Sequence, residues 1–203
     1  MQIIDEHNVA HGATVALGTA TLNGDGTYGV SLKNAFSYLR FKIQNEDVKE
    51  IVLSGNDVNI AGTASFSVAD ASVSGTVGSV STIRASFDGG YFSKDDDYYI
   101  TVLPCTVPEL SFLMVSNTHS ENSGTEGYDD WKAERVASSA LTFPRGTGIK
   151  FDELDCGDKW SWYFDIHDAA SLERYRALVA AGKFPEDGVV RISGDIDPGE
   201  VDP

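Results

Sequence analysis

The histidines are the first side chains in this sequence whose type and spacing could support chemistry. His7 and His11 stand four residues apart, the spacing that places two imidazoles on one face of a helix as zinc ligands. Gly12 and a β-rich run follow directly, which favours an N-terminal tail over a metal-binding helix. His119 lies in a polar stretch without the Ser-His-Asp order or the serine elbow of a hydrolase. The sequence therefore predicts no catalytic residue.

Carboxylates form two clusters that could hold a hard cation such as Ca²⁺. Residues 95–97 are three aspartates directly before a strand-like run, and we expect them to form a solvated turn. In the second cluster, Pro198 and Gly199 occupy positions where the EF-hand pattern needs an oxygen ligand and a later glycine. The acids of that cluster are Asp195, Asp197, Glu200 and Asp202. We expect neither a metal nor a cofactor.

A glycine-rich segment, 24–29, matches the dinucleotide-binding pattern G-x-G-x-x-G. A nucleotide site needs this pattern to open a helix whose N-terminus meets the pyrophosphate. Here Val30 and Leu32 continue a strand, so the match is accidental. The dipeptide Asn23-Gly24 instead supplies the positive φ of a tight turn, which predicts a hairpin.

Aromatic rings that are exposed can stack on the faces of sugars, and several lie in or beside predicted loops. The candidates for such a carbohydrate-binding surface are Tyr128, Trp131, Trp160, Trp162 and Tyr163. The alternative is structural, because a strand over 160–165 has aromatic side chains on both faces. That alternation favours burial of Trp160, Trp162 and Phe164 between a sandwich and the segment that follows it.

The charge balance argues against two classes of partner. The chain has 203 residues, with 15 Lys and Arg against 31 Asp and Glu, and a net charge of −16. Nucleic-acid binders gain affinity by neutralising phosphates with basic side chains, so we expect no nucleic-acid partner and no docking on anionic lipid. No window approaches 18 apolar residues, so no membrane span is predicted. The first residues lack the regions of a signal peptide, so an exported protein would be present here in a mature or trimmed form.

Two cysteines, Cys105 and Cys156, are too few for a disulfide scaffold or a structural zinc site. Their spacing leaves open whether they form a bridge or stay as two buried thiols. Neither has a recognisable activating partner, so neither is a predicted nucleophile.

From Gly12 to about residue 154, short runs with period-two alternation are rich in β-branched and aromatic residues. Leu39, Phe41 and Ile43 share one face of such a run, as a half-buried strand requires. The spacing of roughly ten residues predicts an antiparallel β-sandwich. The predicted strands are 14–22, 27–33, 37–43, 48–54, 57–68, 79–87, 97–104, 108–116, 133–143 and 147–152.

The C-terminal part has a different pattern. Asp168 is the predicted N-cap of one helix, Gly182 ends it, and a last strand covers 189–192. The apolar stripe of the helix is Leu172, Tyr175, Leu178 and Val179.

The acidic excess also changes near residue 150. Residues 1–150 have 10 basic and 18 acidic side chains, and 151–203 have 5 and 13, so both parts carry −8. We therefore divide the chain into an N-terminal tail or exchanged strand over 1–11, a sandwich over 12–155 and a strand-helix-strand segment over 156–203.

Four stretches resemble, in order and spacing, the fimbrillin-type proteins, the pilin-like and adhesin-like outer-membrane-anchored proteins of Gram-negative anaerobes. The stretches are 34–43, 48–55, 60–64 and 97–104 (NAFSYLRFKI, VKEIVLSG, IAGTA and DYYITVLP), and the resemblance covers about 13–155. It implies a transthyretin-like sandwich, surface display and no enzymatic activity. The chain departs from the family because it has no N-terminal lipobox cysteine and no second sandwich of the usual size.

The segments 164–175 and 189–197 (FDIHDAASLERY and VVRISGDID) resemble the entry of right-handed β-helix repeats in surface adhesins. There, a strand, a capping helix and a strand ending in Asp-Ile-Asp precede the first coil. The terminal coil of a solenoid must be capped, and an amphipathic helix over its open end provides such a cap. The resemblance implies that 157–203 begins a longer β-helix domain.

We therefore expect a non-enzymatic protein of the cell surface, held at the outer membrane by a lipoprotein signal outside this chain. It would be a stalk or adhesin module in cell adhesion or fimbria (pilus) assembly, with other surface or pilus subunits, or a surface ligand, as partners. Sandwich edges accept strands from neighbouring subunits, and the run before Gly12 is the candidate for an exchanged strand. The alternative is a carbohydrate-binding module of a glycan-capture system, carried by the aromatic residues above.

Overall fold

The structure is a computed structural model, and it describes residues 2–10, 15–67, 69, 72–88, 90–116, 130–151 and 160–196. These residues form sixteen strands and one helix. The elements are β1 (Gln2–Ile4), β2 (Ala16–Leu22), β3 (Tyr28–Asn34), β4 (Ser37–Lys42), β5 (Glu50–Ser54), β6 (Ala61–Ser67), β7 (Ser72–Val80), β8 (Thr82–Phe87), β9 (Asp97–Val102), β10 (Cys105–Val107), β11 (Ser111–Ser116), β12 (Trp131–Val136), β13 (Leu141–Phe143), β14 (Gly148–Lys150), β15 (Trp162–Ile166), α1 (Ala169–Ala180) and β16 (Val189–Ile192).

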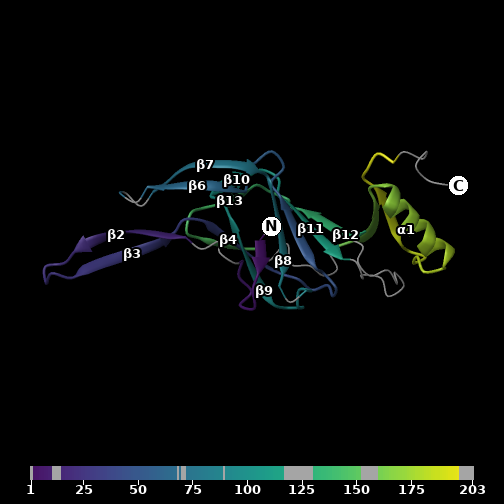
Figure 1. Cartoon of the computed structure of the whole chain (residues 1–203), viewed down its shortest axis with the longest axis horizontal. Helices are drawn as coiled ribbons and strands as arrows, with labels where there is room; N and C mark the ends of the chain where they lie inside the picture. Colours follow the sequence, from purple (N-terminus) through teal and green to yellow (C-terminus); the bar gives the residue numbers. More distant parts are fainter. Residues whose placement is uncertain are drawn as a thin grey trace.

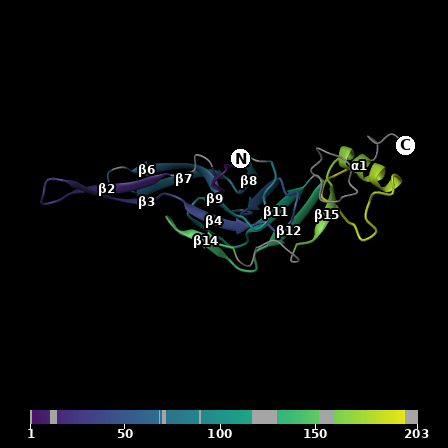
Figure 2. The ribbon, with the colours of Figure 1, turned by 90° about the horizontal axis from the view of Figure 1, so that it is seen from below.

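The fold is mainly β, as predicted: a sandwich with a small helical segment near the C-terminus. A seven-stranded sheet in the order β1-β8-β5-β11-β12-β15-β16 forms one layer, and a three-stranded sheet, β14-β4-β9, forms the other. The seven-stranded sheet runs from the middle of the elongated molecule to the end where α1 lies (Figures 1 and 2). Two-stranded sheets formed by β10-β13, β2-β3 and β6-β7 complete the structure.

The main core lies between the two layers. The alternation predicted for 37–43 is confirmed, because Leu39, Phe41 and Ile43 are buried. They belong to the same cluster as Leu53 of β5 and Phe112 of β11. Side chains from facing sheets therefore interdigitate, as in other β-sandwiches.

The strand directions are more mixed than an antiparallel sandwich requires. Three pairs are parallel: β1 with β8, β14 with β4, and β15 with β16. A parallel pair needs a long crossover between its strands, so these pairings join segments that local sequence patterns do not connect.

Several predicted strands have different limits in the structure. The run 133–143 is two strands, β12 and β13, and the second pairs with β10 instead of continuing in the large sheet. β7 was not predicted over most of its length, because its sequence, SVSGTVGSV, is rich in Ser and Gly. Such residues are weak strand formers by propensity.

Two hairpins, β2-β3 and β6-β7, extend from the sandwich at the end opposite α1 (Figures 1 and 2). The predicted hairpin over 14–33 is confirmed, but its turn differs from the prediction. The positive φ, +83°, belongs to Gly26, and the Asn23 N–H donates to the carbonyl of Thr27. The turn is therefore longer than a two-residue Asn-Gly turn.

The tail expected over 1–11 is a paired segment in residues 2–10. β1 runs parallel to β8 with Ile4 opposite Phe87, and the Ile4 side chain is fully buried. Val9 forms a parallel bridge with Tyr99 of β9. The N-terminal segment therefore contacts both layers of the sandwich.

The C-terminal segment continues the large sheet across the proposed boundary near 156. β15 pairs antiparallel with β12, and β16 pairs parallel with β15. α1 begins after the N-cap Asp168, as predicted, with a capping box to Ser171. The helix ends at Ala180 with Ala181 as its C-cap, and Gly182 follows with φ +65°, so that the Lys183 N–H donates to the Leu178 carbonyl in a Schellman motif.

The predicted apolar stripe of α1 is correct except at one position. Leu178 is buried and Leu172 and Tyr175 are partly buried against the sheet, whereas Val179 is exposed. In the part of the chain that the structure describes, no helix has the length and apolar character needed to cross a membrane.

Candidate functional site

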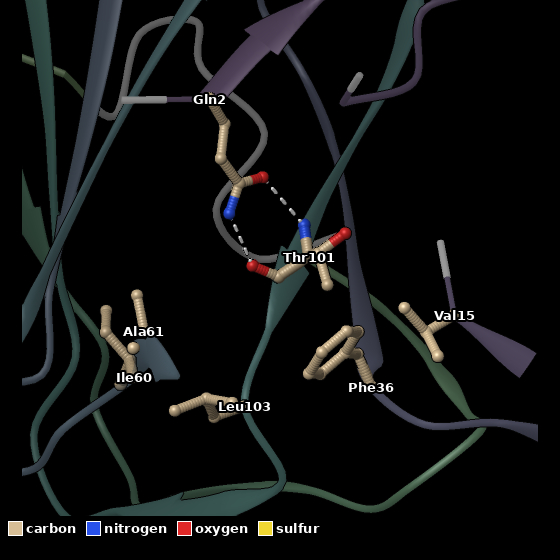
Figure 3. Close-up of a pocket in the computed structure, with 8 residues that line it drawn as sticks. Gln2, Val15, Phe36, Ile60, Ala61, Thr101 and Leu103 are labelled. Atoms are coloured by element: carbon tan, nitrogen blue, oxygen red, sulfur yellow. Dashed lines mark hydrogen bonds between the residues drawn. The ribbon is translucent and has the colours of Figure 1, made fainter. Parts of the chain in front are cut away.

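A pocket lies beside the N-terminal strand, where the end of β9 meets the bases of both hairpins (Figure 3). Its volume is about 280 Å³. Gln2 and Thr101 are its polar side chains, and the rest of the lining is apolar or glycine. The lining residues are Gln2, Val15, Phe36, Ile60, Ala61, Gly62, Thr101 and Leu103.

Gln2 reaches the pocket because of its place on β1. Residues two apart on a strand share one face, so Gln2 lies on the same face as Ile4, which is buried in the core. Its side-chain Nε2 donates to the Thr101 carbonyl at 2.7 Å, and its Oε1 accepts from the Thr101 N–H at 3.0 Å. Figure 3 shows this double contact.

The Gln2 carboxamide takes the place of a neighbouring peptide group. It presents one donor and one acceptor to a single residue, as an opposite residue does in an antiparallel ladder. At Tyr99, the same edge of β9 is paired with main chain: the Tyr99 N–H donates to Asn8 and the Ala10 N–H donates to Tyr99. Residues 2–10 therefore satisfy the hydrogen-bonding groups at this edge of β9. Backbone atoms do so at Tyr99, and the Gln2 side chain does so at Thr101.

The pocket is suited to binding an extended, apolar segment. None of its lining side chains is a carboxyl, imidazole, amine or thiol. What it offers is apolar surface from the half-buried Val15 and Phe36, beside the two backbone groups of Thr101 that the Gln2 side chain occupies. Strand addition to a sheet edge uses these two features: main-chain hydrogen bonds and a pocket for side chains.

The tryptophans predicted as sugar-stacking residues lie largely inside the protein. Trp131 and Trp160 are 4% and 6% exposed, so neither ring face is available to a sugar. Trp160 packs against Phe112 in the main core, and Trp131 packs against Phe164 and Phe184 in a second core under α1. Tyr128 lies outside the described residues.

Trp162 and Tyr163 have different surroundings. Trp162 is half-buried and contacts both hydrophobic clusters. It therefore joins the sandwich core to the helix core, as the structural interpretation of these aromatics predicted. Tyr163 is half-buried on the other face of β15, with the Arg191 guanidinium 5.2 Å from its ring centre.

A cluster of buried charges lies beside the second core. The Arg174 guanidinium of α1 donates to both carboxylate oxygens of Asp130, at 2.5 and 2.7 Å. Lys132 of β12 donates to Asp165 of β15 at 2.5 Å. Both carboxylates are almost fully buried, so each depends on its basic partner for charge compensation.

Asp165 is held in its ionised form. Burial raises the pKa of this carboxyl, but hydrogen bonds from Lys132 and Ser193, together with the electrostatic effects of Lys132 and His167, outweigh burial and leave the pKa below its ordinary value. A buried carboxylate kept charged by a half-buried lysine is suited to holding strands together, not to transferring protons near neutral pH.

His167 lies between two carboxylates, with Nδ1 3.4 Å from Asp165 and Nε2 3.7 Å from Asp168. Its backbone N–H donates to the Ser171 hydroxyl, which also caps the helix. The Ser171 hydroxyl is thus engaged in structural hydrogen bonds and is not placed as a nucleophile that His167 could activate.

The remaining predicted chemical groups are dispersed. His7 lies on the surface near Asp5, and His11, His119 and Cys156 lie outside the described residues. Cys105 is a free thiol, and burial raises the pKa of that thiol, which disfavours the nucleophilic thiolate.

The acidic clusters do not form a cation site among the residues that the structure describes. Asp97 pairs with Arg40 at 2.5 Å, while Asp95 and Asp96 are exposed. Asp197, Glu200 and Asp202 lie outside the described residues. No group of three or more potential metal ligands occurs in the described part of the chain.

Comparison with protein-family models and with curated proteins found no match to this chain.

The residues that form the pocket were not predicted as functional from the sequence. Gln2 and Thr101 are 99 residues apart, and neither type suggests a site by itself. A partial signal was present, because Gln2 precedes two consecutive β-branched residues, Ile3 and Ile4, in a run that was already a candidate strand. The sequence does not indicate that this strand, β1, pairs with β8 and places Gln2 against Thr101 of β9.

Proposed function

We propose that this protein is a non-enzymatic cell-surface module of a fimbrillin-like stalk or adhesin, and that it joins neighbouring subunits by exchange of β-strands. The observation that carries the proposal is the pairing of residues 2–10. This segment lies along the edges of both sheets, and its first described residue, Gln2, contacts Thr101 at an apolar pocket. Outer-membrane attachment through a lipid signal outside this chain belongs to the same proposal.

The exchangeable unit is the N-terminal segment. Ile4 fills a fully buried position against β8, and Asn8 and Ala10 supply the hydrogen bonds to Tyr99. An equivalent segment from another subunit would make the same contacts, so exchange changes the connectivity and leaves the core intact. This is the balance that makes swapping of identical elements a low-cost route to assembly.

The Gln2 contact gives the incoming strand a starting point. Displacing the Gln2 carboxamide from Thr101 breaks two hydrogen bonds, and the Gln2 carboxamide of the incoming segment replaces both. Main-chain pairing of Asn8 and Ala10 with Tyr99 supplies affinity, and the apolar lining at Val15 and Phe36 supplies selectivity.

The opposite edge of the large sheet offers a second joining position. β16 pairs with β15 on one side, and no other described strand pairs with its outer side. Val189 and Ile192 are exposed there. Exposed apolar edge strands are templates for pairing with another chain. A module that exchanges residues 2–10 at one edge of the large sheet and pairs through β16 at the other edge would form linear assemblies.

The test uses the full chain and a fluorescein-labelled peptide with the sequence of residues 1–10. We expect fluorescence anisotropy to rise as the peptide exchanges into the protein. A Gln2→Ala chain should exchange at least several-fold faster, since its own segment has lost the contact to Thr101. A peptide carrying Ile4→Asp is the matched control and should not bind, because it would bury a carboxylate in the core.

Two outcomes would contradict the proposal. One is that neither chain binds the peptide even after prolonged incubation at millimolar concentration. The other is that the Ile4→Asp peptide exchanges as well as the natural sequence, since the binding would then not use the buried position of β1.

Surface display is tested separately in the cells that produce the protein. We expect trypsin added to intact cells to remove this protein while leaving a cytoplasmic marker untouched. Complete protection, lost only when the cells are lysed, would contradict a cell-surface location. Titrating polysaccharides while recording tryptophan fluorescence tests the carbohydrate alternative, which predicts a saturable change in intensity or wavelength.

A further inference from the structure

The hairpin β2-β3 presents an apolar face to solvent. Residues opposite one another in an antiparallel pair lie on the same face, and the register pairs Leu22 with Tyr28, Ala20 with Val30 and Gly18 with Leu32. Beyond Asn34 at the base, which lies opposite Ala16, this face of the hairpin is made of apolar residues and glycine. The other face is mostly polar and carries Leu17, Thr19, Thr21, Gly29, Ser31 and Lys33.

The large side chains of the apolar face are strongly exposed. Leu22, Tyr28, Val30 and Leu32 are 60%, 67%, 58% and 65% exposed. Single exposed apolar residues are ordinary, but a contiguous patch of several hundred Å² marks an interaction site. Here four of the large exposed residues of the chain share one face of one element.

The hairpin has little else to stabilise it. It extends beyond the sandwich at one end of the molecule (Figures 1 and 2), and no third described strand pairs with it. Its anchor is at the base, where the Ala35 N–H donates to the Val15 carbonyl and Arg145 donates to the Asn34 carbonyl. A two-stranded hairpin alone is at best marginally stable in water, so a partner on the apolar face would stabilise it.

The charge distribution is compatible with a second copy of this chain as that partner. The chain carries a net charge of −16, but residues 15–34 contain a single acid, Asp25, and a single base, Lys33. Two copies repel wherever their acidic bodies meet, and the hairpin is neutral. A strand of seven residues is about 23 Å long, and the Debye length at physiological salt is about 8 Å. When two copies contact each other through overlapping hairpins, much of the acidic sandwich of one copy therefore lies farther than a Debye length from that of the other.

We propose that the β2-β3 hairpin is a self-association surface, in which its apolar face packs against the same face of a second copy around a two-fold axis. Such an interface is isologous, because each copy contributes the same patch. Specific interfaces bury at least about 1,000 Å² in total, and two narrow hairpin faces lie near that limit. The dimer is therefore weak and depends on protein concentration. This inference does not depend on strand exchange at residues 2–10.

The first test is sedimentation velocity over a range of concentrations at physiological salt. The natural chain should shift from monomer to dimer as concentration rises. A chain with Tyr28→Thr, Val30→Thr and Leu32→Thr should show a dissociation constant at least tenfold higher. Threonine keeps the β propensity of these positions, and circular dichroism checks that the monomer remains folded.

A matched control alters the opposite face of the same strands. Thr19→Val and Ser31→Val leave the proposed interface intact and should not weaken the dimer. A chain that stays monomeric at every concentration overturns the proposal. A dimer of equal strength in the natural and the triple-threonine chains also overturns it.

Cross-linking gives a second readout that does not rely on affinity. In a background with Cys105→Ser and Cys156→Ser, Val30→Cys places a thiol on the apolar face and Ser31→Cys places one on the polar face. Mild oxidation should produce disulfide-linked dimers from Val30→Cys much more efficiently than from Ser31→Cys. Equal cross-linking of both, or more from Ser31→Cys, contradicts the proposed packing.

Discussion

Arg174 and Asp130 form a buried, two-pronged ion pair that fastens helix α1 to the large sheet. The Arg174 Nε and Nη2 atoms donate to the two carboxylate oxygens at 2.5 and 2.7 Å, and Asp130 is 2% exposed. Asp130 directly precedes β12, and its carbonyl accepts from the N–H of Asp165 in β15. One residue therefore links α1, β12 and β15.

Replacing Arg174 with alanine should destabilise the protein strongly. The substitution leaves the Asp130 carboxylate buried without its partner, and removing one member of a buried ion pair typically costs about 3–5 kcal/mol. We expect this loss in the free energy of unfolding measured with urea. It should be accompanied by a change in the near-ultraviolet signal of Trp131, which adjoins Asp130 in the chain.

Arg176→Ala is the control for the Arg174 prediction. Arg176 pairs with Glu173 on the exposed surface of the same helix, and exposed helix pairs contribute about 0.3–0.5 kcal/mol. Equal effects of the two substitutions would mean that the Asp130 pair does not stabilise the fold.

This pair also indicates what sequence patterns can and cannot predict. The helix itself was predictable, because Asp168, the spacing of Leu172, Tyr175 and Leu178, and Gly182 are local signals. The period of the helix placed Arg174 off the apolar stripe, which suggested exposure. Its partner is 44 residues away, and no local pattern encodes that distance.

Asp165 should make the stability of the protein depend on pH. Its pKa is below the ordinary value in the folded state, so it binds a proton more readily when unfolded. The stabilisation from such a group is present above the unfolded pKa, about 4, and is lost as the pH falls through the lower, folded pKa. We expect the free energy of unfolding to decrease from pH 5 downward.

Asp165→Asn tests the assignment of this pH dependence. At pH 7 the variant leaves Lys132 without its buried partner, at a cost of about 3–5 kcal/mol. The difference between variant and natural chain should shrink at the lowest pH, where Asp165 is protonated in both states. Asp96→Asn, an exposed aspartate outside the cluster, should show little difference at any pH. A gap between Asp165→Asn and the natural chain that stays constant from pH 7 to pH 2 would contradict the assignment.

The sandwich and its pocket differ in how much the sequence could predict. The alternation of Leu39, Phe41 and Ile43 identified a buried strand face, because a half-buried strand leaves a period of two in its own sequence. The contact of Gln2 with Thr101 leaves no such trace. It arises because β1 pairs in parallel with β8, and parallel neighbours are set by the topology of the whole chain.

Gly194 should be among the least replaceable residues of the C-terminal segment. It follows β16, where the chain passes so close to β15 that a Cβ atom would lie 1.9 Å from the His167 carbonyl oxygen. Gly194→Ala therefore forces β16 away from β15, and such overpacking costs about 1–3 kcal/mol. Hydrogen exchange should report the change as faster exchange of amides that pair the two strands, such as the Ser193 N–H that donates to Ile166.

Gly148→Ala is the matched control. Gly148 is the first residue of β14, which pairs in parallel with β4, and an added Cβ atom there would meet nothing within 4 Å. We expect this variant to retain the stability of the natural chain or to gain slightly, since alanine restricts the unfolded state more than glycine does. If Gly194→Ala matches Gly148→Ala in both stability and exchange, the close approach of β16 to His167 does not exist in solution. The edge proposed for joining a further subunit would then be positioned differently, because β15 is the one described strand that pairs with β16.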